Sequence, residues 1–163
     1  MAYWKKLGSL FFLIFLSCSD FVMSVRCREV DTLRVLEGDI VRLKDRCFFV
    51  EIDKGANVRE LETDIGKIIN YGKVGRMFLG VGEVENRGEI RSAEVGTGKF
   101  KNFGQIDSLE LGMGELENRG FIKFADLGVG RALNYGKMIK LSIGVGRGEN
   151  KGSLDSLDVG LRF

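Results

Sequence analysis

The sequence contains no histidine and no proline, and only three cysteines and one tryptophan among its 163 residues. Without histidine, the commonest general base and metal ligand is missing, and Ser–His or Cys–His catalytic pairs are excluded. Three cysteines alone are too few for a usual zinc site. The 25 basic residues nearly balance the 23 acidic ones, unlike the strongly basic composition of nucleic-acid-binding proteins. We therefore predict no enzyme activity, no cofactor and no nucleic-acid partner.

Glycine, in contrast, is abundant at 23 residues. Glycine without proline is not the composition of collagen or of a linker. No G-x-x-x-x-G-K-[ST] phosphate-binding loop occurs. The glycines are therefore expected where the backbone itself requires them.

The N-terminus has the features of a secretory signal peptide. Two lysines precede the apolar run Leu7–Leu16, which is too short to span a bilayer, and small residues follow it. We predict a signal peptide over residues 1–24, cleaved after Ser24, and a secreted mature chain without a membrane span. Cleavage after Ser19, an uncleaved anchor, and a lipid anchor at Cys18 of the bacterial lipoprotein kind are the alternatives.

Cysteine usage agrees with export. Removal of the signal peptide leaves Cys27 and Cys47, and an even pair in a secreted chain predicts one disulfide. Its loop of about 20 residues would contribute about 3 kcal/mol in the chain-entropy model. Two buried, unpaired thiols are the alternative.

Six consecutive units of 16 residues occupy residues 64–159 without insertion. The segments GVGEVENRGEI, at 80–90, and GMGELENRGFI, at 112–122, show the repeat most clearly. The unit reads G-x-G-x-h-x-N-x-G-x-h-x-x-h-x-h, where h is apolar. Its seventh position is always asparagine: Asn70, Asn86, Asn102, Asn118, Asn134 and Asn150. Its ninth position is always glycine: Gly72, Gly88, Gly104, Gly120, Gly136 and Gly152. A period kept this strictly indicates a repeat architecture.

The unit pattern predicts an all-β fold. Residues spaced two apart lie on the same face of a strand. One such set contains positions five, seven, nine and eleven of the unit. The other set contains positions fourteen and sixteen together with position two of the next unit. The face changes at positions three–four and twelve–thirteen, where we expect turns, with the glycine at position three adopting positive φ. Each unit is then a flattened coil of two short strands, and six stacked coils bury a continuous core. A membrane β-barrel would need longer strands than 16-residue units allow.

The predicted architecture is therefore a β-solenoid of six 16-residue coils over residues 64–159, with a C-terminal tail at 160–163. Residues 25–63 form an irregular N-terminal cap with a partial coil, tied by the predicted disulfide. In that partial coil, Ile52, Val58 and Leu61 are expected at positions five, eleven and fourteen. The cap would cover the first coil, as solenoids require.

The asparagine column points into the core on this parity. Because a buried amide must be hydrogen-bonded, we predict that the six asparagines form a ladder from coil to coil, as in cross-β stacks. The glycine at position nine would leave room beside each amide. This column is expected to be structural rather than catalytic.

The segments VENRGEI, FKNFGQI and LENRGFI resemble the repeats of filamentous-haemagglutinin-type β-solenoid surface proteins. The resemblance covers about residues 64–159 and implies the solenoid fold and a surface or adhesin role. It brings no catalytic residues with it.

Two outward columns are candidate interaction sites. Position eight alternates aromatic and cationic side chains, and its candidate ligand face consists of Tyr71, Arg87, Phe103, Arg119 and Tyr135. These side chains would either stack on one another from coil to coil or bind a sugar or another flat ligand. Position four alternates in charge as well, so the coil repeats every 16 residues while its surface repeats every 32.

Position fifteen provides a candidate acidic column, which consists of Glu94, Glu110, Asp126 and Asp158. Like charges stacked directly are unfavourable. The glycines at position one form an exposed strip beside it. This border would accept a basic partner, Ca²⁺ or another rod, or it is simply a solvated edge.

The leading hypothesis is a secreted, non-enzymatic structural or self-assembling extracellular β-solenoid protein. Self-association would use the C-terminal coil, whose strand edge is open, or the glycine strip. The alternative is a monomeric extracellular binding or adhesion module for a glycan or a surface ligand. An enzyme with carboxylates on a regular solenoid surface ranks third.

Overall fold

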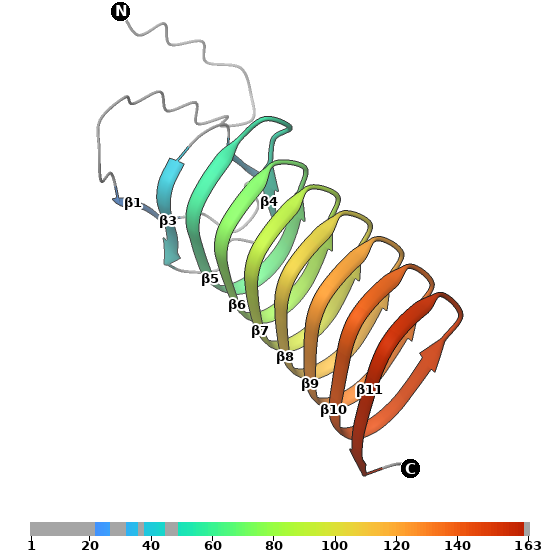
Figure 1. Cartoon of the computed structure of the whole chain (residues 1–163). Helices are drawn as coiled ribbons and strands as arrows, with labels where there is room; N and C mark the ends of the chain where they lie inside the picture. The colour runs from blue at the N-terminus through green and yellow to red at the C-terminus, as the bar shows by residue number, and fades with distance from the viewer. Residues whose placement is uncertain (1–21, 27–31, 36–37, 45–48, 162–163) are drawn as a thin grey trace, which may run out of the picture.

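The computed structural model describes residues 22–26, 32–35, 38–44 and 49–161, which form a parallel β-solenoid (Figure 1). The strands are β1 (Val22–Arg26), β2 (Thr32–Val35), β3 (Gly38–Lys44), β4 (Phe49–Ile52), β5 (Asn57–Asn70), β6 (Lys73–Asn86), β7 (Glu89–Asn102), β8 (Gln105–Asn118), β9 (Phe121–Asn134), β10 (Lys137–Asn150) and β11 (Ser153–Leu161). The predicted cleavage position after Ser24 falls within β1. Residues 1–21 of the predicted signal peptide, Cys18 included, and the predicted disulfide partners Cys27 and Cys47 lie outside the described residues.

The predicted β-solenoid is confirmed. Each of β5 to β10 is 14 residues long and pairs in parallel with the next strand. The register advances by one repeat at every step, so that Ile68 lies opposite Val84, and Val84 lies opposite Phe100. Regular pairing extends from Asn57 to Leu161, slightly beyond the predicted bounds of 64–159.

Each coil is one bent strand rather than two separate short ones. The glycines at position three bend the strand with φ values between 145° and 153° in Gly82, Gly98, Gly114, Gly130 and Gly146. Successive bends stay in register, with Gly82 opposite Gly98, so pairing continues through them. A Cβ atom on Gly98 would lie 1.8 Å from the carbonyl oxygen of Gly82. The predicted positive φ is confirmed, and only glycine fits here.

The core is a column of apolar side chains between the two halves of every coil. Positions five, eleven, fourteen and sixteen point inward together with the asparagines. The core residues of the inner coils include Ile68, Val84, Phe100, Leu116, Ile90, Ile106, Ile122, Met138, Leu79, Val95, Leu111, Leu127 and Ile143. In the last coil, Leu154 and Val159 are half-buried and pack against this core. The columns predicted from the repeat are therefore the buried ones.

The first coil departs from the predicted register at one residue. Val58 and Leu61 lie opposite positions eleven and fourteen of the next coil, as expected. Ile52, however, lies opposite Asn70, at position seven rather than position five. The reason is the turn that follows Ile52, because Asp53–Ala56 has four residues where the later turns have two. Ile52 thus fills the place of an asparagine below the first rung of the ladder.

Candidate functional site

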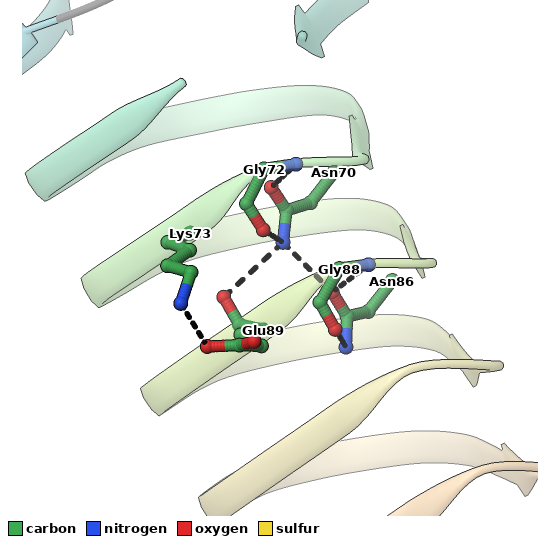
Figure 2. A network of polar contacts seen from close by, with 6 residues as sticks. All are labelled: Asn70, Gly72, Lys73, Asn86, Gly88 and Glu89. Carbon is green, nitrogen blue, oxygen red and sulfur yellow. Dashed lines mark hydrogen bonds and ion pairs between the residues drawn. The ribbon is translucent and has the colours of Figure 1, made fainter. Parts of the chain in front are cut away.

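The asparagine ladder is confirmed and connects all six coils. Figure 2 shows its first step, from Asn70 to Asn86. Asn70 Nδ2 donates to Asn86 Oδ1 at 2.8 Å, and Asn86 Nδ2 donates to Asn102 Oδ1 at 2.8 Å. The same bond joins Asn102 to Asn118, Asn118 to Asn134 and Asn134 to Asn150, at 2.7–2.8 Å.

Each asparagine also fixes the turn that follows it. Asn86 Oδ1 accepts the backbone N–H of Gly88 at 3.2 Å, the geometry of an Asx turn. Asn86 Nδ2 also contacts the backbone carbonyl of Gln105 in the next coil, at 3.3 Å. The glycine at position nine is needed because the turns nearly touch: a Cβ atom on Gly104 would lie 2.1 Å from the carbonyl oxygen of Gly88. Its role is therefore this close approach, and the ladder is a structural element with every amide group used.

The predicted ligand face lies along the turns that follow β5 to β9. Its aromatic rings remain 40–41% exposed in Tyr71, Phe103 and Tyr135. The guanidinium of Arg87 lies 5.0 Å from the ring centre of Phe103, and that of Arg119 lies 5.0 Å from the ring centre of Tyr135. The five predicted residues therefore form a continuous column of alternating rings and cations.

The arginines of this column are also held by carboxylates of their own strands. Arg87 Nε donates to Glu85, and Arg119 Nε donates to Glu117 Oε1 at 2.7 Å. Hydrogen bonding to Glu85 raises the pKa of Arg87, and Glu117 does the same for the pKa of Arg119. Each of these two arginines therefore stacks on a ring of the next coil and also forms an ion pair with a glutamate of its own strand. Glu85 and Glu117 were not predicted from the sequence, although residues two apart on a strand share a face.

The predicted acidic column runs along the opposite side of the coils. Glu94 lies opposite Glu110, and Glu110 lies opposite Asp126. Ser142 separates Asp126 from Asp158 in this column. All four predicted acids are exposed, and the described residues contain no group of three ligand side chains arranged for a metal ion.

The glycine strip beside the acidic column is exposed from Gly96 to Gly144. A Cβ atom on Gly112 would lie 2.6 Å from the carbonyl oxygen of Gly96. Close approach of successive strands therefore accounts for these glycines.

An exposed apolar column borders the strip and was not predicted. Position two was grouped by parity on one face with positions fourteen and sixteen, which are buried, and this grouping is wrong. The column consists of Ile65, Val81, Thr97, Met113 and Val129, with Val81 50% and Met113 53% exposed. The inward–outward alternation breaks here because the strand already bends before the glycine at position three.

Alternating charge at position four pairs successive coils, as predicted. Lys67 Nζ lies 3.4 Å from Glu83, and Lys99 Nζ lies 3.1 Å from Glu115. Arg131, in contrast, pairs with Glu149 of the next coil at 3.2 Å. These side chains, together with those at positions six and eight, form one outward face of the rod.

Comparisons with protein families, with characterised proteins and with solved structures found no match to this chain. In the described part of the chain, no helix is long and apolar enough to cross a membrane.

Proposed function

We propose that this chain is an exported, non-enzymatic structural rod that assembles with copies of itself. The observation that carries the proposal is the strand edge at the β11 end of the stack (Figure 1). β11 pairs with β10 over Lys137–Val145, and among the described residues no strand lies on the outer side of Gly146–Asn150, which pairs with β9 on its inner side, or along the outer edge of β11. Open edges of this kind recruit further strands.

The asparagine ladder makes this edge selective for its own repeat. Asn150 Nδ2 donates to the carbonyl oxygen of Gly152 at 3.2 Å, whereas each inner asparagine also donates to the next asparagine. A strand carrying the N-x-G repeat would supply the missing acceptor at the same 16-residue register. In a second copy, the N-x-G strands β5 to β9 are already paired on both sides, so the strand edge that it offers is that of its own last coil, Asn150 included.

The test is sedimentation of the purified protein over a wide concentration range. We expect species that grow with concentration. Leu157, an apolar residue of the last coil that is 42% exposed, lies at this edge, and Leu157→Lys should stop the growth. Val129→Lys is the matched control, because Val129 is 43% exposed but lies on the side of the rod. A protein that stays monomeric at every concentration would overturn the proposal.

Export is tested separately by the mature N-terminus. Expression of the full chain in a secreting host, followed by mass spectrometry, should find a protein that begins at Val25. A start at Asp20 or a lipid on Cys18 would still mean export, by one of the two alternative routes. A retained Met1 on a protein left inside the cell would refute it.

A binding or adhesion module is the second candidate, and the three exposed rings of the position-eight column favour it. Flat rings at regular spacing suit sugars or other flat ligands. Replacing Tyr71, Phe103 and Tyr135 together by serine should abolish binding to glycans or surfaces while the circular dichroism spectrum stays unchanged. Phe124→Ser, at a ring 45% exposed outside the column, is the control. Binding that survives the triple substitution would exclude this candidate.

A further inference from the structure

The face formed by positions four, six and eight carries a charge pattern that is complementary to itself. It comprises the second halves of β5 to β10 and the turn residues that follow them. The midpoint of this face lies between β7 and β8. On β7 and its turn, the face presents Lys99, Lys101 and Phe103, and on β8 and its turn it presents Glu115, Glu117 and Arg119.

The same alternation extends to the neighbouring strands. β6 presents Glu83, Glu85 and Arg87, whereas β9 presents Arg131, Leu133 and Tyr135. From β5 to β9, cationic and anionic residues therefore alternate in position four, and from β5 to β10 rings alternate with cations in position eight. The alternation in position four ends at β10, where Arg147 follows Arg131.

We propose that two copies of the rod pair through this face, antiparallel, about a two-fold axis that passes between β7 and β8. Such an axis leaves each column facing the same column of the second copy and reverses the order of the strands. β7 then faces β8, and β6 faces β9. This inference rests on the proposed function, for which it identifies a lateral contact and its partner.

The contacts made by this arrangement are favourable in all three columns at its centre. Lys99 of one copy faces Glu115 of the other, Lys101 faces Glu117, and the ring of Phe103 faces the guanidinium of Arg119. The symmetry makes each contact twice. A shift by one strand would instead oppose Lys99 to Lys99, so the pattern also fixes the register of the pair.

Lys101 supports a contact with a second copy, because ion pairs within one rod do not account for it. It lies opposite Glu85 on β6 and Glu117 on β8, yet it forms no ion pair with any residue of the described part of the chain. Those two glutamates are occupied by the arginines two residues after them. Lys101 is therefore available to Glu117 of a second copy, whose bond to Arg119 uses Oε1 and leaves Oε2 for this contact.

The size of the face sets the expected strength. Six strands at about 4.8 Å and five residues at about 3.3 Å give a face near 30 by 17 Å, so pairing would bury on the order of 1,000 Å² in total. This is the low end for specific contacts, and the contacts are charged and exposed. We therefore expect a weak dimer that salt dissociates.

Complementary charge reversal tests the pairing. Lys101→Glu and Glu117→Lys should each weaken the dimer at least tenfold in sedimentation equilibrium at low salt, at protein concentrations up to about millimolar. An equimolar mixture of the two variants should restore it, because each reversed charge then faces its opposite. Lys140→Glu makes the same charge change on the other side of the rod and should leave the dimer intact. Circular dichroism of each variant verifies folding.

The outcomes separate this inference from assembly at the β11 end. A mixture that fails to recover the dimer, or a control as damaging as Lys101→Glu, overturns the pairing. Concentration-dependent growth that is unchanged by Lys101→Glu and Glu117→Lys also overturns it, while leaving end-to-end assembly standing. A salt-sensitive species that stops at two copies, and is lost and restored as described, supports the pairing even where end-to-end growth fails.

Discussion

Replacing Asn102 by alanine is the sharpest test of how this fold is held together. Asn102 is fully buried in the middle of the ladder. Its Oδ1 accepts from Asn86 Nδ2 at 2.8 Å and from the backbone N–H of Gly104 at 3.2 Å, and its Nδ2 donates to Asn118 Oδ1 at 2.8 Å. Its Nδ2 also donates to the backbone carbonyl oxygens of Gly104 and Phe121, both at 3.2 Å. Alanine removes all five bonds and leaves the amides of Asn86 and Asn118 each without one partner in the core.

The expected loss is large for a protein of this size. A buried polar group left without its partner costs about 1–3 kcal/mol, and two such groups remain after the substitution. With the lost Asx turn, we expect Asn102→Ala to lower the free energy of unfolding by about 3–6 kcal/mol. Domains are typically stable by only about 5–15 kcal/mol in total. Asn150→Ala, at the exposed last rung, should cost about 1 kcal/mol, because only Asn134 loses a ladder partner and its Nδ2 still donates to the carbonyl oxygen of Ser153 at 2.9 Å.

Urea unfolding followed by circular dichroism measures both variants. Comparable slopes of the unfolding free energy against urea are required, since repeat arrays can lose two-state behaviour. If Asn102→Ala costs no more than Asn150→Ala, the ladder is not a stabilising network. The backbone pairing between strands would then suffice, and the reasoning from buried amides would be refuted.

Three further predictions concern single residues. Thr63 is fully buried and its hydroxyl has no hydrogen-bond partner in the described part of the chain, so Thr63→Val should stabilise the fold by about 1 kcal/mol in urea unfolding; a loss of stability would indicate a partner. Gly130→Ala should destabilise by about 3 kcal/mol or more, because its φ is 149° and a Cβ atom would lie 1.9 Å from a backbone carbonyl oxygen. Gly148→Ala, whose Cβ would meet only side chains at 3.1 Å or more, should change stability little or raise it, and equal effects of the two alanines would contradict this account. Hydrogen bonding from Lys151 lowers the pKa of Glu149. This contact therefore stabilises the fold above the ordinary carboxyl pKa, and the stabilisation is lost as the pH falls through the lowered pKa. An NMR titration of Glu149 in the folded protein should have its midpoint below that of an unpaired glutamate, and an ordinary midpoint would contradict the contact.

Much of the fold could be predicted from the repeat because backbone pairing and burial both follow the period. A strict 16-residue spacing requires identical residues to lie side by side in parallel strands, and this alone indicates the ladder from Asn70 to Asn150. Parity then separates inward from outward positions wherever the strand is straight. These arguments need no knowledge of side-chain conformation.

The same parity argument failed where the strand bends. Parity placed position two on one face with the buried positions fourteen and sixteen, yet Val81 and Met113 at position two are about half exposed. Alternation assumes a regular extended strand, and it is interrupted at Val81, next to Gly82 with its positive φ. Parity also could not predict that Ile52 lies at position seven, because its register depends on the length of the irregular turn that follows it. The ion pair between Arg131 and Glu149 joins position four to position six of the next coil. A repeat pattern does not specify such partners in different columns.

The 32-residue surface period has a consequence for folding that the 16-residue core period lacks. If β7 were skipped, β6 would pair with β8 with little change in the core, since Val84 would pack against Leu116. The ladder would also continue, because Asn86 would lie opposite Asn118. On the surface, however, Glu83 would lie beside Glu115, and the cations of Arg87 and Arg119 would meet. Each exposed cross-strand contact contributes about 0.2–1 kcal/mol, so the change from attraction to repulsion in three columns penalises the skipped register by ~1–5 kcal/mol. A repeat whose core cannot distinguish one coil from the next therefore relies on its outer columns to keep every coil in order.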